Sequence, residues 1–323
     1  MKRVVWGIIG CGDVAEKKSG PAFNIVNNSS LLAVMRRDIG KAKDFANRHN
    51  VPFYFDDAND IINHPEINSI YIATPPSTHL QYALAVLKVN KNVYLEKPMT
   101  LNVEEAKDLH KALEKSSSKL TVAHYRRGLP MFLKVKDLIN EEALGTTKSI
   151  ELNLFQSRHK AISEVPKSNW RLNPAISGGG YFHDLAPHQL DLLLFWFGNI
   201  KDYSGDSVCE NPNRNFATKI NGIINFERGL SCKASWDFLA AESEQKDECI
   251  ISGTKGSLTF ALFGDKITIE KDGKEEILKF EHPKYIQTPM IQNTTNYFLG
   301  KNENPCSVED GLVTMKIIDD FTS

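Results

Sequence analysis

The chain has 323 residues, with 39 lysines and arginines against 40 aspartates and glutamates, so it is nearly neutral. This balance provides no electrostatic case for binding nucleic acid or an anionic membrane. No apolar run approaches the roughly 20 residues that span a bilayer. Five scattered cysteines without a Cys-x-x-Cys pair indicate a reducing compartment and argue against a cysteine-type zinc site. The start also lacks the regions of a signal peptide. We therefore expect a cytoplasmic globular protein without a metal and long enough for two domains.

The first part of the chain alternates predicted strands and helices. Residues 4–9 form an apolar run that ends at Gly10, which is typical of a buried parallel strand. The same pattern recurs in residues 31–35, 52–55, 69–73, 92–95 and 120–123. Stretches of helical period, such as residues 41–49 and 103–113, lie between these runs. This alternation predicts a Rossmann-type, doubly wound parallel sheet over residues 1–125, and the glycine turn described below makes this the dinucleotide-binding domain.

The pattern changes in the second part, where the predicted strands are no longer separated by regular helices. These strands are residues 149–155, 218–226 and 230–238, and a hairpin with Asp272-Gly273 at its turn is predicted within residues 266–279. Helices are predicted over residues 289–299 and 308–321, which could pack back on the first domain. We therefore expect residues 126–323 to form a C-terminal α+β domain with a large, mostly antiparallel sheet; the family resemblance described below implies that this domain serves substrate binding and oligomerisation.

A glycine-rich turn directly follows the first predicted strand. The segment Gly10-Cys11-Gly12-Asp13-Val14-Ala15 has the pattern G-x-G-x-x-A and precedes a helical pattern. In a dinucleotide-binding turn, Gly10 permits the tight turn, Gly12 lets the backbone approach the pyrophosphate, and Ala15 allows close packing of helix and sheet. The helix N-terminus would then offer its N–H groups to the phosphates.

The residues after the second predicted strand bear on the choice of cofactor. An acidic residue there would bind the ribose hydroxyls of NAD, whereas an arginine accommodates the 2′-phosphate of NADP. Arg36 and Arg37 come first, and Asp38 lies one or two positions too late. The sequence favours NADP, with NAD as the alternative; the two arginines could also belong to a solvated turn.

Three motifs in order along the chain carry a family resemblance. Glu96-Lys97-Pro98 follows the fifth predicted strand, at the strand ends where parallel sheets bind ligands. A second motif, Ala73-Thr74-Pro75-Pro76-Ser77-Thr78-His79, precedes it, and Gly178-Gly179-Gly180 is followed by Asp184 and His188. Together with the glycine turn, these motifs resemble the glucose–fructose oxidoreductase / inositol dehydrogenase family (Gfo/Idh/MocA) over nearly the whole chain.

The resemblance implies an NAD(P)-dependent dehydrogenase or reductase acting on a CH–OH group, with Lys97, Asp184 and His188 as the catalytic group. His188 suits the role of base because its ordinary pKa lies near neutrality, and Lys97 could stabilise alkoxide charge. We expected Pro187 in the first turn of a helix, with Asp184 just ahead of it. The resemblance also assigns a cofactor-binding set: Gly10, Gly12, Asp13, Val14, Ala15, Arg36, Arg37, Thr74, Pro75, His79, Glu96 and Lys97.

The substrate is less well defined by the sequence. The family acts mostly on sugars, cyclitols and related small molecules, and Tyr125, Arg126, Trp170 and Arg171 are candidates to border such a substrate. Arg126 and Arg127, after the sixth predicted strand, could bind a carboxylate or phosphate of the substrate, or could be surface charges or partners in interdomain ion pairs. The resemblance further implies a homodimer or homotetramer. Two other functions on this fold stay open: a non-catalytic dinucleotide-sensing regulator, and a glycoside hydrolase that uses NAD as a transient oxidant.

Overall fold

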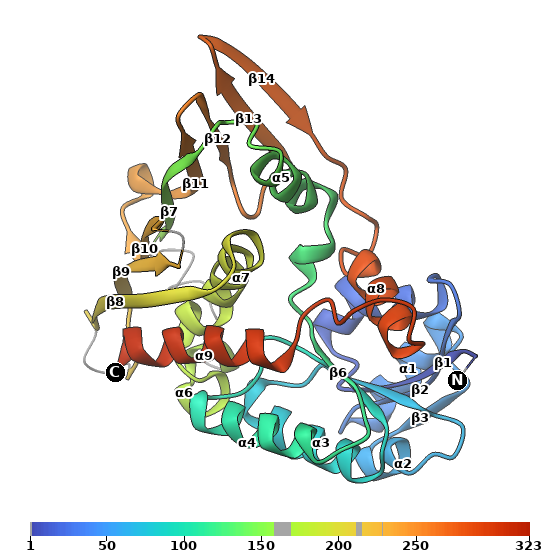
Figure 1. Ribbon diagram of the computed structural model, residues 1–323. Helices are drawn as coiled ribbons and strands as arrows, with labels where there is room; N and C mark the ends of the chain where they lie inside the picture. Colours follow the sequence, from blue (N-terminus) through green and yellow to red (C-terminus); the bar gives the residue numbers. More distant parts are fainter. Residues whose placement is uncertain (1, 158–168, 211–214, 228) are drawn as a thin grey trace. The chain divides into compact units, whose positions relative to one another are not determined.

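The computed structural model describes residues 2–157, 169–210, 215–227 and 229–323, and it divides the chain into two compact units (Figure 1). The first unit contains Met1–Leu129 and His282–Met315, and the second contains Pro130–Glu281 and Lys316–Ser323. In the described part of the chain, no helix is long and apolar enough to cross a membrane.

The first unit is built on a six-stranded parallel sheet in the order β3-β2-β1-β4-β5-β6. Its strands are β1 (Val4–Ile9), β2 (Ser29–Met35), β3 (Phe53–Phe55), β4 (Ser69–Ile72), β5 (Asn92–Leu95) and β6 (Leu120–Val122). The helices of this unit are α1 (Ile39–His49), α2 (Ala58–Ile62), α3 (His79–Lys88), α4 (Val103–Glu114), α8 (Thr288–Phe298) and the first part of α9 (Val308–Thr322). The Rossmann-type sheet predicted from the sequence is confirmed, and every predicted strand is present within two residues of its expected bounds.

Apolar strands and aromatic side chains form the core of this unit. All four residues of β4 are buried, and only the first residue of β5 is not. Trp6, Phe23, Tyr71 and Tyr94 are fully buried against one another, with ring centroids 4.8–6.5 Å apart. Two of these rings are tyrosines, whose hydroxyls need hydrogen-bond partners inside the core.

The second unit contains an eight-stranded sheet in the order β14-β13-β12-β11-β7-β10-β9-β8, in which only the pair β10–β7 is parallel. Its strands are β7 (Thr147–Ser157), β8 (Ile200–Val208), β9 (Lys219–Phe226), β10 (Ser231–Ala240), β11 (Lys246–Gly253), β12 (Gly256–Phe260), β13 (Lys266–Lys271) and β14 (Lys274–Lys279). Its helices are α5 (Pro130–Asn140), α6 (Pro174–Ser177) and α7 (Gly180–Phe197). This mostly antiparallel sheet confirms the predicted fold class.

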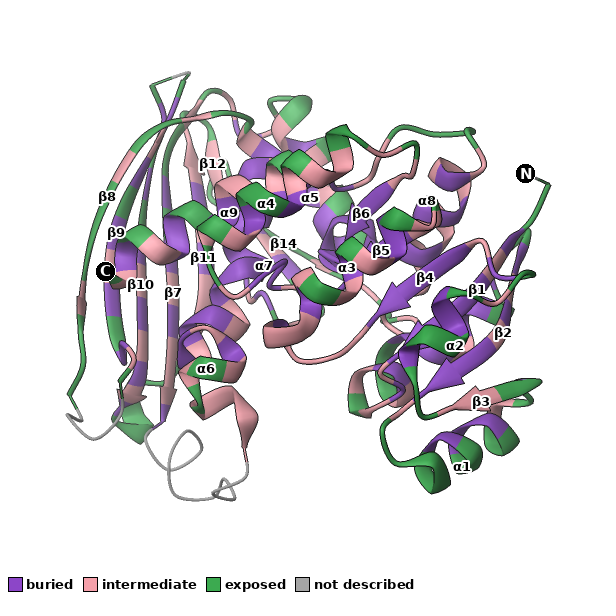
Figure 2. Cartoon of the chain, turned by 90° about the horizontal axis from the view of Figure 1, so that it is seen from below, coloured by how far each residue is buried: buried purple, intermediate pink, exposed green. Residues whose placement is uncertain are grey.

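The strands of this sheet alternate buried and more exposed residues, so one face is covered and the other is open (Figure 2). In β10, Cys232, Ala234, Trp236 and Phe238 are all buried. The predicted hairpin is also present: Asp272 and Gly273 have φ of 52° and 70° between β13 and β14, as a two-residue turn with positive φ at both positions requires.

The C-terminal end of α9 packs against two glycines of this sheet. Gly205 of β8 lies opposite Gly222 of β9, and a Cβ at Gly222 would come within 2.3 Å of the Phe321 ring. Phe321 is only 1% exposed and lies 6.5 Å from the Trp236 ring. The absence of two side chains on the sheet therefore makes room for one phenyl ring.

We expect Phe321→Ala to lower the stability of this unit by about 3–5 kcal/mol, because it leaves a cavity against two glycines that cannot fill it. Chemical unfolding followed by tryptophan fluorescence measures the change. Phe263→Ala is the matched control in the same unit, since Phe263 is 44% exposed. Equal losses in both variants would contradict the packing described here.

Candidate active site

The glycine turn links the ends of neighbouring strands in the first unit. Gly10 has φ of 97°, and a Cβ on it would lie 2.9 Å from the backbone of Ala73, just after β4. The N–H groups of Gly10 and Cys11 both donate to the Met35 carbonyl at the end of β2, at 2.9 and 3.0 Å. Glycine is therefore required at position 10 by both conformation and space.

Gly12 differs from Gly10, because none of the described residues crowds it. A Cβ built on Gly12 meets no described heavy atom within 4 Å. A side chain there would project into open space beside the turn rather than into the core. This is the space that a pyrophosphate would need for close approach to the backbone, so the turn fits the phosphates of a dinucleotide.

The segment after the turn is an irregular helix. It is a short π-helix, Ala15–Ser19, followed by a 3₁₀-helix, Gly20–Asn24. The N–H of Gly20 donates to the carbonyl of Ala15, five residues back, and Pro21 has no N–H to continue the ladder. The helical pattern expected after the turn is therefore present, as a π-helix and a 3₁₀-helix rather than a continuous α-helix.

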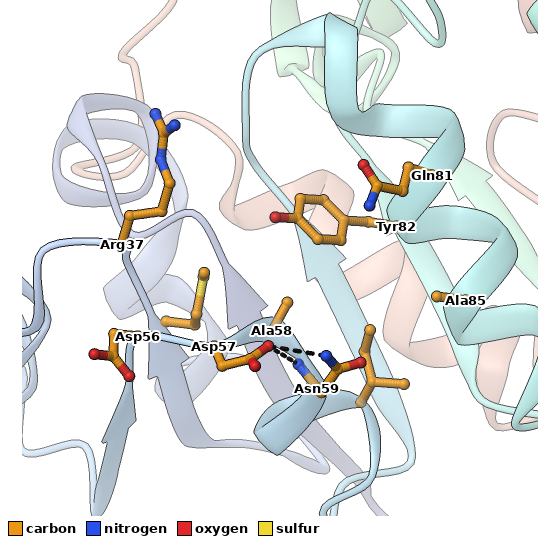
Figure 3. Close-up of a pocket in the computed structure, with 10 residues that line it drawn as sticks. Arg37, Asp56, Asp57, Ala58, Asn59, Gln81, Tyr82 and Ala85 are labelled. Atoms are coloured by element: carbon orange, nitrogen blue, oxygen red, sulfur yellow. Dashed lines mark hydrogen bonds between the residues drawn. The ribbon is translucent and has the colours of Figure 1, made fainter.

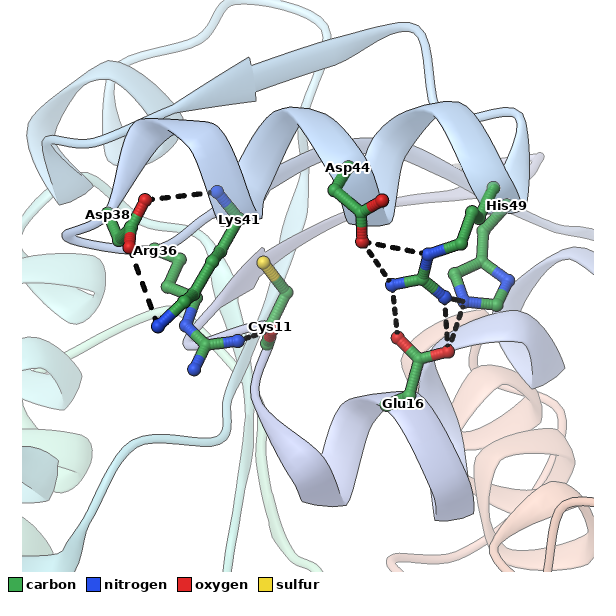
Figure 4. A network of polar contacts seen from close by, with 8 residues as sticks. Cys11, Glu16, Arg36, Asp38, Lys41, Asp44 and His49 are labelled. Atoms are coloured by element: carbon green, nitrogen blue, oxygen red, sulfur yellow. Dashed lines mark hydrogen bonds and ion pairs between the residues drawn. The ribbon is translucent and has the colours of Figure 1, made fainter.

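An ion-pair network holds this segment against α1 (Figure 4). The Arg48 guanidinium donates to both oxygens of Glu16, at 2.6 and 2.9 Å, and to Asp44 at 2.8 Å. His49 Nε2 lies 2.9 Å from the same Glu16 carboxylate. The hydrogen bonds from Arg48 lower the pKa of Glu16 below its ordinary value. This network ties the residue just after the glycine turn to the C-terminal end of α1.

The residues after β2 have three different roles. Arg36 Nη1 lies 3.4 Å from the Cys11 carbonyl of the glycine turn. Arg37 lines a pocket of about 460 Å³ together with Asp56 and Asp57, which follow β3, and Tyr82 of α3 (Figure 3). The Asp38 side chain accepts from the Lys41 N–H and caps α1. Asp38 thus serves the helix, and the two arginines are the side chains that lie toward the turn and the pocket.

His79 joins the loops that follow β4 and β5. The imidazole is fully buried, with Nε2 2.8 Å from the Thr74 carbonyl and Nδ1 3.0 Å from the Pro98 carbonyl. Burial lowers the pKa of His79. The structure thus brings together two of the expected cofactor-binding motifs, the one from Thr74 to His79 and the one around Lys97.

Lys97 lies two residues after the end of β5, and its peptide bond to Pro98 is cis. The neighbouring Glu96 is 6% exposed, and its carboxylate is held by protein groups. Oε1 accepts from the Tyr71 hydroxyl at 2.5 Å and from Gln287 Nε2 at 2.6 Å, and Oε2 accepts from the Lys97 N–H at 3.1 Å. Glu96 therefore has three hydrogen bonds within the first unit.

Sequence reasoning missed Tyr71, Tyr94 and Gln287 as partners of this site. The Tyr94 hydroxyl donates to Gln287 Oε1 at 3.1 Å. Two tyrosines within otherwise apolar buried strands were the available signal, because a buried hydroxyl needs a polar partner. Nothing local in the sequence connects Gln287 to Glu96, which lies 191 residues earlier.

Asp184 and His188 lie in α7 of the second unit. The expectation that Pro187 begins a helix was wrong: α7 begins at Gly180, and Pro187 lies inside it. The proline only removes the N–H that would reach the carbonyl of His183, and the helix continues through a strongly apolar segment. Asp184 and His188 are consequently one helical turn apart on the same helix.

The side chains around Asp184 come from the segment just before the glycines. Arg171 Nε donates to Asp184 Oδ2 at 2.9 Å, and its guanidinium lies 4.5 Å from the centre of the Trp170 indole. His188 is 3% exposed, and its ring packs edge-on to Phe263 at 6.3 Å. His183 directly precedes Asp184 in the chain, and burial lowers its pKa to about 4. The His183 imidazole is therefore neutral at physiological pH.

The other substrate candidates lie in the first unit. Tyr125 and Arg126 follow β6 in a short 3₁₀-helix, Tyr125–Gly128, and each is 3% exposed. The Arg126 guanidinium lies 5.4 Å from the centre of the Tyr125 ring. Both residues are thus part of the interior of this unit, at the carboxyl end of the sheet.

Nearly the whole chain is similar to proteins of one known family. Residues 4–124 match the Gfo/Idh/MocA family model described as an oxidoreductase family with an NAD-binding Rossmann fold, and residues 132–259 match the family's C-terminal domain. Oxidoreductase P35 of Formosa agariphila is 47% identical over 319 residues, which cover 99% of this chain and 98% of that protein.

Solved structures of similar proteins have the same fold. Aldose–aldose oxidoreductase from Caulobacter crescentus, complexed with glycerol, is 20% identical with a TM-score of 0.87. Levoglucosan dehydrogenase, in complex with NADH and levoglucosan, is 20% identical with a TM-score of 0.86. Each alignment covers 99% of this chain and 96% of the other. With both domains matched and a full-length relative at 47% identity, the protein belongs to the Gfo/Idh/MocA family of NAD(P)-binding oxidoreductases.

Proposed function

We propose that the protein transfers a hydride between NADP(H) and a secondary hydroxyl or carbonyl of a sugar, cyclitol or related small molecule. The observation that carries the dinucleotide part of this proposal is the open space beside Gly12, at the carboxyl end of β1. The sugar-like substrate is supported by two proteins of the same fold, one crystallised with levoglucosan and one named as an aldose oxidoreductase. A screen of glucose, levoglucosan and inositol with NADP and with NAD tests it.

The residues around the glycine turn would hold the cofactor. The proposed set comprises Gly10, Gly12, Asp13, Val14, Ala15, Arg36, Arg37, Thr74, Pro75, His79, Glu96 and Lys97. The pocket that Arg37 lines lies beyond the ends of β2 and β3, where open parallel sheets bind their ligands. We assign it to the adenosine half of the dinucleotide. Asp56 and Asp57 also line this pocket, and their carboxylates disfavour a negatively charged phosphate beside Arg37. Arg36 is therefore better suited than Arg37 to bind the 2′-phosphate of NADP.

The catalytic roles follow from the chemistry of three side chains. When bound, the nicotinamide supplies the acceptor or donor of the hydride. In the oxidation direction, His188 accepts the proton of the substrate hydroxyl, since a neutral imidazole is a suitable base near pH 7. The Lys97 ammonium stabilises negative charge that develops on the substrate oxygen. Asp184, held by Arg171, orients the hydroxyl, and Tyr125, Arg126, Trp170 and Arg171 border the substrate.

Gly12→Val should abolish dinucleotide binding while the protein stays folded, because the new side chain fills the space beside the turn and meets no protein atom at Cβ. Titration with reduced nicotinamide cofactor, followed by its fluorescence, measures binding, and circular dichroism verifies folding. Binding of normal strength in this variant would show that the turn is not the phosphate site.

Replacing both Arg36 and Arg37 with alanine should weaken NADP binding selectively and leave NAD binding almost unchanged, because NAD lacks the 2′-phosphate. Charged hydrogen bonds of this kind contribute about 1.5–3 kcal/mol each, so we expect roughly tenfold to hundredfold weaker NADP binding. The single variant Arg36→Ala should account for most of the loss. Equal affinity of the unmodified protein for NADP and NAD would refute the preference.

His188→Ala should lower turnover by about 10²–10⁴-fold, the range typical of general-base catalysis, with little change in NADP affinity. Lys97→Ala should cause comparable damage, and the double variant should lose less than the product of the two because both act on one transition state. Steady-state kinetics with a substrate from the screen provides the measurement. Near-normal turnover in His188→Ala would assign the histidine a structural role only.

We also propose that two copies pack through the open face of the eight-stranded sheet, as a homodimer or as half of a homotetramer. Ile223 lies within β9 and is 43% exposed, and an exposed apolar residue on a broad sheet face favours association. Light scattering at micromolar concentration should give at least twice the chain mass of 36.3 kDa. Ile223→Lys should shift the protein toward the monomer, and a monomeric unmodified protein would overturn this proposal.

A further inference from the structure

Gln287 is a fully buried polar residue just before α8, and each of its polar groups has a partner in the first unit. Its backbone N–H donates to the Lys18 carbonyl at 3.1 Å. Its side chain donates from Nε2 to Glu96 at 2.6 Å and accepts at Oε1 from Tyr94 at 3.1 Å. One residue thus joins the segment that follows the glycine turn to the carboxylate beside Lys97.

Tyr71 makes a second connection between the same two segments. Its hydroxyl donates to Glu96 at 2.5 Å and accepts from Ser19 Oγ at 3.1 Å. Ser19 ends the short π-helix after the glycine turn. Two parallel hydrogen-bonded paths therefore run from residues 18 and 19 to Glu96, and from Glu96 to the Lys97 N–H at 3.1 Å.

The direction of these hydrogen bonds follows from the charges involved. Burial, together with the charge of Glu96, raises the pKa of Tyr71 and of Tyr94 well above the ordinary value. Both tyrosines therefore stay protonated and act as donors. An ionised carboxylate only accepts, so Gln287 must turn Nε2 toward Glu96 and Oε1 toward Tyr94. Glutamine meets both demands, which a carboxylate or an aliphatic side chain at this position would not.

We propose that Gln287 and Tyr71 are positioning residues that hold the Glu96 carboxylate and, through its bond to the Lys97 N–H, fix the backbone from which the Lys97 side chain projects, just after β5. This inference rests on the proposed catalytic role of Lys97. Gln287 and Tyr71 themselves do not contact the reacting atoms. Gln287 and Tyr71 therefore affect turnover only through Lys97. A residue that merely stabilises the fold would affect turnover whether or not Lys97 is present.

Gln287→Met tests this proposal because methionine keeps the length of the side chain and removes both hydrogen bonds. In the unmodified background we expect turnover at saturating substrate and cofactor to fall about tenfold. In a Lys97→Ala background the same substitution should change turnover by less than about twofold, because residues that act through one group are not additive. NADPH affinity, measured by fluorescence, should stay within about twofold.

A second readout does not depend on activity. Hydrogen–deuterium exchange at the Lys97 amide, whose acceptor Glu96 loses a partner, should become about tenfold faster in Gln287→Met. Gln292→Met, five residues further along in α8, is the matched control, since Gln292 bonds to Asn27 and Asn296 and to no described group of the Glu96 network. Tyr71→Phe removes a single hydroxyl and should act in the same direction if Gln287→Met fails to fold.

The outcomes separate this inference from the proposed function. Equal loss of turnover from Gln287→Met in the Lys97→Ala and unmodified backgrounds would overturn the positioning role, as would weakened NADPH binding with unchanged turnover at saturation. Unchanged Lys97 amide exchange in both Gln287→Met and Tyr71→Phe would also overturn it. Near-normal turnover in Lys97→Ala itself would instead overturn the proposed function, and the inference with it.

Discussion

A buried carboxylate imposes the strongest constraint on the first unit. Glu96 is 6% exposed, and a charge removed from water is tolerated only when hydrogen-bond donors surround it. Its donors come from β4, from the residue before α8 and from the chain just after β5. Removing one donor weakens the solvation of the carboxylate, and a hydrogen bond to a charged group typically contributes about 1.5–3 kcal/mol. The three segments must therefore be in place together.

The same constraint explains why residues near the C-terminus are part of the first unit. His282–Met315 follow the second unit in sequence and belong to the first in space. Gln287 is the residue of this segment that satisfies Glu96, and its backbone is also bonded to Lys18. The requirement to complete a buried hydrogen-bond network thus adds to the apolar contacts of α8, whose Phe298 lies 5.5 Å from Trp6.

The two glycines of the glycine turn, Gly10 and Gly12, lie in different surroundings. Gly10 is constrained by its positive φ and by the approach of β4, so its role is to close the sheet around the turn. Gly12 faces open space, so contacts with the described residues do not require a glycine there. The segment that follows is an irregular helix held by the Glu16–Arg48 pair and by the Ser19–Tyr71 hydrogen bond. Tertiary contacts therefore replace the regular helical hydrogen bonding that Gly20 and Pro21 interrupt.

The sequence by itself determined the features that local periodicity and short motifs encode. The parallel strands, the hairpin at Asp272-Gly273 and the glycine turn could be predicted, because apolar periodicity and turn chemistry depend on neighbouring residues. The family was identified by resemblance, from short motifs that occur in order along the chain. The sequence also pointed to Lys97, Asp184 and His188, through motifs whose residues lie close together along the chain.

Tertiary structure decided what depends on residues distant in sequence. It decided that α7 continues through Pro187, that Asp38 caps α1, and that Arg171 pairs with Asp184. It also decided which groups surround Glu96, because a hydrogen bond between residues 96 and 287 leaves no local pattern in either segment. Buried polar partners are chosen by the packing of the whole unit, and periodicity contains no information about that choice.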